Sequence, residues 1–437
     1  MATQVNANPT KEFFISMLTR DIDIRAAIME LIDNSIDGAK KLRKNGDYSG
    51  LYIRIEYDES HFKISDNCGG IGIQTAKDYA FRFGRSSKRP QTEVGQFTGV
   101  FGIGMKRSLF RLGNNFQIFS ATKNDSFELN VDVKEWLTDE NTNWTFNLEN
   151  EQIDLNNNEE STGTTITITN LHDGIVNQFK TKHFYHSLLL YVERFKTLAI
   201  ETGLEISING TPVVFSSEKI IKSASVVPYS NSFTVDDVTV KIVAGIAPKG
   251  KPENAGWYIY CNGRLIVYAD KTNLTGWGED GVKNYHPSLA FFRGFLFFES
   301  DNLDKLPWNT TKTNVDASSS QYIYAKMKMR EAMLQIIEDC HPITEGAVSD
   351  EVEKEILSDK YLFPINTHNI EALISSSTAF TLNVPELKKI ERTAGISFQK
   401  PVKEIEIMKK HMGAKNNKEV GIIAFDYYFK KECDADG

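Results

Sequence analysis

Cysteine is scarce in this sequence, with four residues among 437, at positions 68, 261, 340 and 433. No two of them form a CxxC pair, so we expect neither a disulfide framework nor a zinc site, and a reducing, cytoplasmic location fits best. Long apolar runs are also lacking, because none approaches the roughly 20 residues that span a bilayer. The first ten residues are polar and do not resemble a signal peptide. We therefore expect no membrane partner.

Positive charge is not in excess either. The chain has 50 lysines and arginines against 58 aspartates and glutamates, which gives a formal net charge of -8. This balance argues against a uniformly basic nucleic-acid binder but leaves room for a local basic patch. Hydrophobic residues make up 41% of the chain and charged residues 25%, as in ordinary globular proteins, and the length allows two or three domains.

Hydrophobic periodicity predicts helices and strands in alternation. Helices are expected over residues 11–44, with one internal turn, and over 102–111, 182–198 and 322–340. Strands are expected at 51–57, 62–65, 115–121, 126–133, 164–169, 204–208, 238–246, 256–260, 265–268 and 293–298. Residues 149–161, rich in asparagine and glutamate, predict an exposed loop, and the apolar patch 422–429 fits either a final strand or a helix.

The most informative segment is ELIDNSID at residues 30–37. On a helix, Glu30, Asn34 and Asp37 fall on one face. Burying such a face is costly without a partner, and Mg²⁺ carrying phosphates is a suitable one because this ion prefers oxygen ligands. Acidic helix faces are more often simply solvated, so this segment alone leaves both interpretations open.

Two glycine-rich segments follow it. In ISDNCGGIG, residues 64–72, a strand end delivers Asp66 into a turn where glycines permit positive φ and let a ligand approach the backbone. The carboxylate of Asp66 can accept a hydrogen bond from an exocyclic amine, although an ordinary Asx turn explains the segment equally well.

In GQFTGVFGIGMKR, residues 95–107, Gly102 and Gly104 precede a helix start and Lys106 lies in its first turn. Backbone N–H groups at a helix N-terminus bind anions, and a lysine there adds a positive charge for phosphate. The spacing matches neither a Walker A sequence nor the dinucleotide fingerprint, so P-loop and Rossmann interpretations fail.

Taken in order, these segments resemble the N box and the two glycine boxes of the GHKL ATPases. That superfamily includes gyrase B subunits, histidine kinases, heat-shock chaperones, MutL proteins and the MORC ATPases. Gly163 and Thr164, followed by a strand, resemble the last, glycine-threonine box. The closest similarity is to the MORC or chaperone-like branch, in its stand-alone prokaryotic form. One departure is Cys68, which stands where the first glycine box normally has its first glycine.

The resemblance implies an α+β fold in three parts. Residues 1–175 would form a Bergerat-type α/β sandwich that binds ATP, residues 176–330 a mixed α/β transducer-like domain, and residues 331–437 a mainly helical C-terminal region. It also implies Mg²⁺-dependent ATP hydrolysis that drives domain closure or the formation of a homodimer.

The resemblance also assigns roles to matching residues. Glu30 would orient and deprotonate the attacking water, because phosphoryl transfer depends chiefly on positioning and charge neutralisation. Asn34 would ligate Mg²⁺, and Asp66, helped by Thr164, would accept a hydrogen bond from the adenine amine. Asp33 and Asp37 would have supporting roles. The remaining ATP-binding residues would be Gly70 and Gly72 beside the base and ribose, and Lys88, Gly102, Ile103, Gly104, Met105 and Lys106 beside the phosphates.

Two further segments resemble parts of the transducer domains of this group. YIYCNGRLI at residues 258–266 resembles a strand-turn-strand, and LPWNTTKT at 306–313 resembles the loop that sends a lysine into the nucleotide pocket. Lys312 would then reach the γ-phosphate and make domain orientation depend on ATP, the alternative being a surface lysine. Residues 83–99 would form a lid over ATP, in which Lys88 either contacts phosphate or belongs to a solvated basic loop.

Three functional classes compete. The first is an ATPase that opens and closes a dimer or domain interface, acting on an unidentified client such as DNA or a partner effector, for example a nuclease in a defence system. A sensor-type kinase needs a phosphoacceptor histidine before the N box, yet the first histidine is His61. An ATP-gated scaffold with negligible turnover is the third class and remains the alternative.

Overall fold

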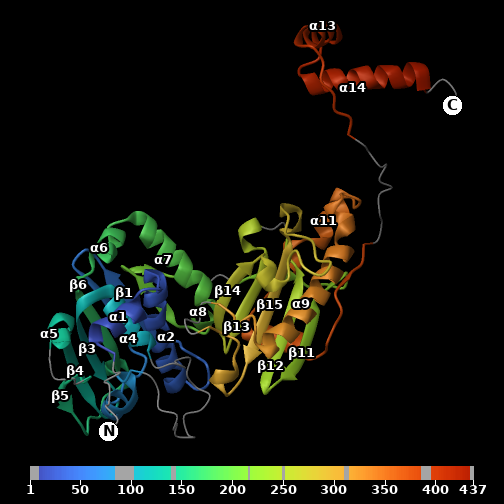
Figure 1. Cartoon of the computed structure of the whole chain (residues 1–437). Coiled ribbons are helices and arrows are strands. Elements are labelled where there is room, and N and C mark those ends of the chain that lie inside the picture. The colour runs from blue at the N-terminus through green and yellow to red at the C-terminus, as the bar shows by residue number, and fades with distance from the viewer. Residues whose placement is uncertain are drawn as a thin grey trace, which may run out of the picture. The chain divides into compact units, whose positions relative to one another are not determined.

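The protein has a mixed α+β architecture, seen in a computed structural model (Figure 1). The chain divides into two compact units, Met1–Leu387 and Lys388–Gly437. No helix among the described residues is long and apolar enough to cross a membrane. The structure describes residues 9–83, 103–138, 144–214, 217–248, 251–309, 314–384 and 395–433.

The first sheet has eight strands in the order β5-β4-β3-β6-β2-β1-β7-β8. Neighbouring strands are antiparallel except β1 and β7, which are parallel. The strands are β1 Tyr52–Tyr57, β2 His61–Asp66, β3 Gly113–Ala121, β4 Ser126–Asp132, β5 Leu148–Gln152, β6 Gly163–Leu171, β7 Glu205–Ile208 and β8 Thr211–Pro212. The prediction of a loop at residues 149–161 is wrong at its start, because β5 pairs with β4 there.

The helices of this part are α1 Lys11–Thr19, α2 Ile24–Leu42, α3 Ile73–Thr75, α4 Gly104–Leu112, α5 Val133–Thr138, α6 Asp173–Phe179, α7 Lys182–Phe195 and α8 Thr197–Glu201. The helix expected over residues 182–198 therefore stops at Phe195, and Lys196 separates α7 from α8. Buried side chains of α7, β7 and the segment up to Val213 belong to the same core as the first sheet. The sheet and core that begin within residues 1–175 thus continue beyond them.

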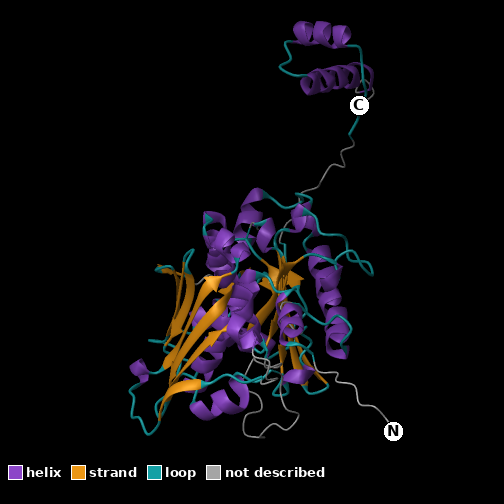
Figure 2. Ribbon diagram, turned by 60° about the vertical axis from the view of Figure 1, so that its left-hand side comes forward, coloured by secondary structure: helices purple, strands orange, loops and turns teal. Residues whose placement is uncertain are grey.

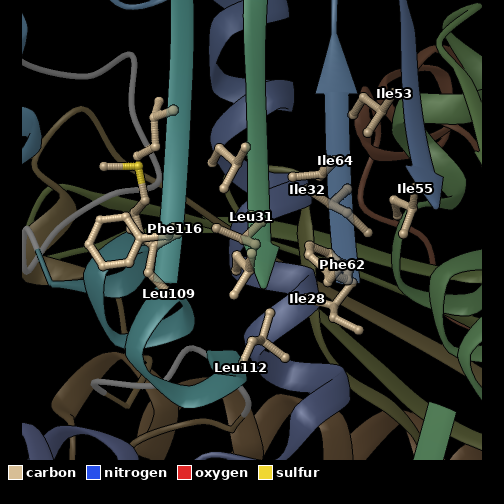
Figure 3. Packing of buried hydrophobic residues seen from close by; sticks show 14 of the residues in the cluster. Ile28, Leu31, Ile32, Ile53, Ile55, Phe62, Ile64, Leu109, Leu112 and Phe116 are labelled. Atoms are coloured by element: carbon tan, nitrogen blue, oxygen red, sulfur yellow. The ribbon is translucent and has the colours of Figure 1, made fainter. Parts of the chain in front are cut away.

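Helix α2 lies against the first sheet through apolar residues at helical spacing. Ile28, Leu31 and Ile32 are fully buried in one cluster with Phe62 and Ile64 of β2 (Figure 3). Burying one such side chain stabilises the fold by about 1.5–3 kcal/mol. Helix α4 packs against α2 and contributes to the same cluster. This packing fixes α2, which carries the predicted N box, between the sheet and α4.

The second sheet has five strands in the order β11-β12-β15-β13-β14, antiparallel except for β13 and β15. Figure 2 shows the strands of the protein gathered in two groups with helices beside them. Its core packs against α9 and is rich in aromatic residues, among them Trp257, Phe292 and Tyr322. The strands are β11 Tyr229–Val235, β12 Val238–Ile246, β13 Gly256–Cys261, β14 Arg264–Asp270 and β15 Phe292–Glu299. The helices that follow are α9 Ser320–Asp339, α10 His341–Thr344, α11 Asp350–Ile356 and α12 Thr367–Ile374.

Two small two-stranded sheets pair strands that precede the second sheet in sequence with strands that follow α9. They pair β10 (Val226–Val227) with β17 (Thr381–Leu382), and β9 (Lys219–Ile221) with β16 (Leu362–Pro364). The second unit contains helices α13 (Val402–Met412) and α14 (Asn417–Tyr428). The patch at residues 422–429 is therefore largely helical, which decides between the strand and helix alternatives.

Candidate functional site

A pocket with about 430 Å³ of empty space, its open mouth included, lies beside α2, the end of β2 and the start of β6. The mixture of apolar walls with a few polar groups is typical of small-molecule sites. Five residues predicted to bind ATP line it together: Asn34, Asp66, Gly70, Met105 and Thr164. The other lining residues are Leu31, Ser35, Gly38, Ile64, Cys68, Ile71 and Ile166.

Asp66 ends β2 and is held by three hydrogen-bond donors. Its Oδ2 accepts from the Ser35 hydroxyl at 2.6 Å, and its Oδ1 accepts from the backbone N–H groups of Cys68 at 2.9 Å and Thr164 at 3.3 Å. Burial raises the pKa of the Asp66 carboxyl, while these three hydrogen bonds favour the charged form. Three fixed donors hold the carboxylate in one orientation at the pocket wall.

Cys68, the departure from the first glycine box, contributes through its backbone. Its N–H binds Asp66, a contact that any residue except proline provides. Its side chain is 2% exposed, and burial raises the pKa of its thiol, so the sulfur packs as a small apolar group. Gly38 of α2 makes room for this turn, because a Cβ there would lie 3.3 Å from the Cβ of Cys68 and closer still to its carbonyl oxygen.

Two glycines let the turns around the pocket touch backbone to backbone. Gly70 has φ +70, and a Cβ on it would overlap the carbonyl oxygen of Ala121. Gly163 has φ +146, and a Cβ on it would overlap the carbonyl oxygen of Asp66. Gly72 has an ordinary φ of -72 and lies beside the side chain of Asp125, outside the pocket lining.

We expect Gly70→Ala to lower the free energy of unfolding by at least about 2 kcal/mol, because left-handed strain adds to a clash with backbone that cannot move away. Gly46→Ala is the matched control: its φ is +77, but a Cβ there meets nothing within 4 Å. It should lose only the strain, about 1–2 kcal/mol. Urea unfolding of both variants measures the difference, and equal losses would contradict the proposed clash.

Asn34 differs from its neighbours on α2. From residue 27 to residue 37, every position is buried except Asn34, which is exposed and lines the pocket. Its carboxamide oxygen is a hard donor of the kind Mg²⁺ accepts. Among the described residues there is no cluster of three or more His, Cys, Asp or Glu side chains arranged for a metal. A site with one protein donor fits Mg²⁺, because this ion usually takes its other ligands from phosphates and water.

Glu30 lies one turn before Asn34 and is buried, at 7% exposure. Its Oε2 faces the start of α4 so closely that a Cβ on Gly104 would overlap it. Ile103 precedes α4 and is half-buried. Arg107 of α4 is close enough for Glu30 to favour its charge, although burial dominates and lowers the pKa of Arg107. The start of α4 therefore abuts the carboxylate of Glu30.

Lys106, which is expected beside the phosphates, is buried in this structure. It is 2% exposed, and its ammonium donates to the carbonyl oxygen of Ala80 at 2.8 Å. It is not part of the pocket lining. Lys88, Gly102 and Lys312, together with most of the expected lid, lie outside the described residues.

A buried cluster of charges joins α2 to later parts of the chain. Arg264 of β14 contacts Asp33 Oδ2 through Nη1 at 2.5 Å and donates from Nη2 to Glu30 Oε1 at 3.4 Å. Lys196, between α7 and α8, pairs with Asp33 Oδ1. Burial lowers the pKa of Lys196 to about 8 despite Asp33. Burial also disfavours the charge on Arg264, but Asp33, Glu30 and Asp37 outweigh it and raise its pKa.

The acidic face of α2 is divided between two cavities. Asp37 lies with Asp33, Ile36 and Lys40 on the lining of a second cavity with about 750 Å³ of empty space. Asn34 lies on the lining of the first pocket. Asp37 therefore does not line the pocket with Asn34. Asp37 instead stabilises the charge on Arg264.

Sequence reasoning missed three residues of this site: Ser35, Lys196 and Arg264. Ser35 lies inside the N box, but its position next to Asn34 in the sequence does not indicate that it donates a hydrogen bond to Asp66. Arg264 follows an Asn-Gly pair between two apolar runs, which is a strong hairpin signal. That signal does not indicate that the arginine contacts Asp33 and Glu30, which are distant in the sequence. Lys196 interrupts a helical pattern and carried no signal of its own.

Residues 22–164 match the family model described as Histidine kinase-, DNA gyrase B-, and HSP90-like ATPase. A GHKL-type ATPase domain therefore occupies these residues. The match contains the whole lining of the pocket except Ile166, and it ends at Thr164. A comparison with curated proteins gives no significant match. An ATPase domain of this type implies binding and hydrolysis of ATP.

Proposed function

We propose that the protein is an Mg²⁺-dependent ATPase of the GHKL type, whose ATP cycle drives domain closure or homodimer formation. The observation that carries the proposal is the pocket in which a firmly oriented Asp66 and an exposed Asn34 meet, next to a buried Glu30. These groups belong to the domain that matches the ATPase family.

In this proposal the base of ATP lies against Asp66. The carboxylate accepts a hydrogen bond from the adenine amine, and Thr164 assists through its hydroxyl, which lies 3.0 Å from the Ser120 hydroxyl. Gly70 and Gly72 allow the base and ribose to lie near the backbone. The apolar side chains of Leu31, Met105 and other lining residues exclude water around the base.

The phosphates lie at the start of α4. Backbone N–H groups at a helix N-terminus attract anions, which gives Gly102, Ile103, Gly104 and Met105 their proposed role. Lys88, Lys106 and Lys312 are the proposed cationic contacts. Asn34 holds Mg²⁺, which neutralises charge on the phosphate oxygens when bound. Glu30 orients the attacking water and takes its proton.

The finer assignments belong to the same proposal. They are the MORC or chaperone-like prokaryotic branch, the domains at residues 1–175, 176–330 and 331–437, an ATP-dependent homodimer, and a client that is DNA or a protein effector. The alternative of an ATP-gated scaffold uses the same pocket without turnover.

A single-turnover experiment separates the two functions. The protein in excess over ATP should release phosphate when Mg²⁺ is present and not when it is chelated. Binding of ATP without phosphate release would favour the scaffold, and absence of binding would overturn both.

Asp66→Asn should weaken ATP binding by about 10–100-fold, because a hydrogen bond to a charged group contributes about 1.5–3 kcal/mol. The amide cannot accept from all three present donors and still accept from adenine. The preference for ATP over GTP should also fall, since guanine presents a carbonyl where adenine has its amine. Asp58→Asn, at an exposed turn that holds Ser60 and His61, is the control. Titration calorimetry with both nucleotides measures the effect, and an unchanged ATP to GTP ratio would contradict the assignment.

A further inference from the structure

One hairpin of the second sheet contacts α2, the helix that carries Glu30 and Asp33. Strands β13 and β14 are joined by Asn262 and Gly263, whose φ values of +46 and +77 suit a type I′ turn. The Asn262 side chain donates to the carbonyl oxygen of Ser300 at 2.9 Å and accepts from its N–H at 3.0 Å. Two hydrogen bonds therefore hold the turn against the end of β15, and they also restrict the position of the residue that follows the turn.

That residue is Arg264, whose side chain is 7% exposed. Its guanidinium bridges two acids of α2, with Nη1 at 2.5 Å from Asp33 and Nη2 at 3.4 Å from Glu30. A planar guanidinium holds two carboxylates in a defined geometry that a single-point cation does not reproduce. Asp33 also forms an ion pair with Lys196. The guanidinium of Arg264 therefore contacts a carboxylate held by a second cation on one side, and Glu30 on the other.

The carboxylate of Glu30 is held at one oxygen, and the other oxygen faces α4. Oε1 accepts from Arg264, and Oε2 abuts the start of α4 at Gly104. A group that orients an attacking water must hold its position closely, because a misplacement of about 1 Å can cost about 100-fold in rate. A residue of the second sheet, Arg264, therefore directly contacts Glu30, the group on which hydrolysis depends.

We propose that Arg264 is a positioning residue that holds Glu30 in its working orientation and makes ATP hydrolysis depend on the placement of the β13–β14 hairpin. The inference rests on the proposed function, since it gives Glu30 the role of orienting water. Arg264 itself is not in the lining of the ATP pocket, so it acts on the rate and not on nucleotide binding.

The test compares three variants of the full-length protein. Arg264→Gln should lower kcat by about 10–100-fold while KM and the directly measured ATP affinity stay within about twofold. Arg264→Lys should recover part of the rate, because it restores the charge without the planar fork. Arg293→Gln is the matched control: Arg293 is also buried in the second sheet, and it bonds Glu218 at 3.2 Å and the carbonyl oxygens of Ala290 and Phe292, all of which lie outside α2. It should leave kcat near that of the unmodified protein.

A double variant shows whether Arg264 acts through Glu30. When Glu30→Gln is already present, adding Arg264→Gln should not lower the residual rate further, because residues that act as a unit are not additive. A full additional loss would overturn the inference, as would an increase in kcat, equal losses in Arg264→Gln and Arg293→Gln, or loss of ATP affinity. If the unmodified protein does not hydrolyse ATP, the proposed function fails. If it does and Arg264→Gln matches it, only the inference fails.

Discussion

Glu30→Gln is expected to lower ATP hydrolysis by about 10²–10⁴-fold, the usual contribution of a positioned general base, while ATP binding persists. Glutamine keeps the size of the side chain and an oxygen that can accept from Arg264, but it cannot take a proton from water. Arg264 keeps Asp33 as its ionic partner, so the fold should tolerate the change. Steady-state phosphate release and nucleotide titration on the same preparation measure the two quantities separately.

The control for this substitution is Glu218→Gln. Glu218 forms an ion pair with Arg293 at 3.2 Å, so the same charge is removed from a similar pair outside the ATP pocket. Its turnover should stay close to that of the unmodified protein. A Glu30→Gln variant that hydrolyses ATP within a few-fold of the normal rate would remove Glu30 from the mechanism.

The elements with strong periodicity could be predicted from the sequence. The helical pattern over residues 11–44 corresponds to α1 and α2, and the strand expected at 238–246 has the bounds of β12. Strand β11, Tyr229–Val235, was not predicted, because YSNSFTV has a polar composition and becomes a strand through pairing with β12. The short strands β10 and β17 pair residues that are 154 and 156 positions apart, a relation that local patterns do not contain.

The residues of the candidate site likewise fall into those that the sequence predicted and those that it did not. Asn34, Asp66 and Thr164 were expected in one place because each lies in a motif of the ATPase family, and the pocket brings them together. Arg264 and Lys196 could not be found by that route. Their importance comes from burial beside Asp33, and burial is set by how distant parts of the chain pack. Motifs therefore predicted several residues that line the pocket, whereas tertiary packing determines the buried charges beside Asp33.

Asp33→Ala is expected to lower the free energy of unfolding by about 3–5 kcal/mol, because it leaves two buried cations without their main partner. Lys196 and Arg264 both pair with Asp33, and their side chains are 3% and 7% exposed. Arg264 retains the longer contact with Glu30, at 3.4 Å, and the attraction of Asp37, which favours its charge less than Asp33 and Glu30 do. Urea unfolding of the full-length protein, followed by two spectroscopic probes because more than one transition can occur, measures the loss.

Two further variants identify the cause of that loss. Glu59→Ala removes a carboxylate from an exposed pair with Lys180, at 3.1 Å, and should change stability little because water already solvates both charges. Adding Lys196→Met to Asp33→Ala removes one of the uncompensated cations and replaces it with an apolar side chain of similar length. Part of the lost stability should then return, since a buried pair replaced by apolar groups is often neutral or stabilising. If the double variant is less stable than Asp33→Ala alone, the loss comes from packing around α2 and not from buried charge.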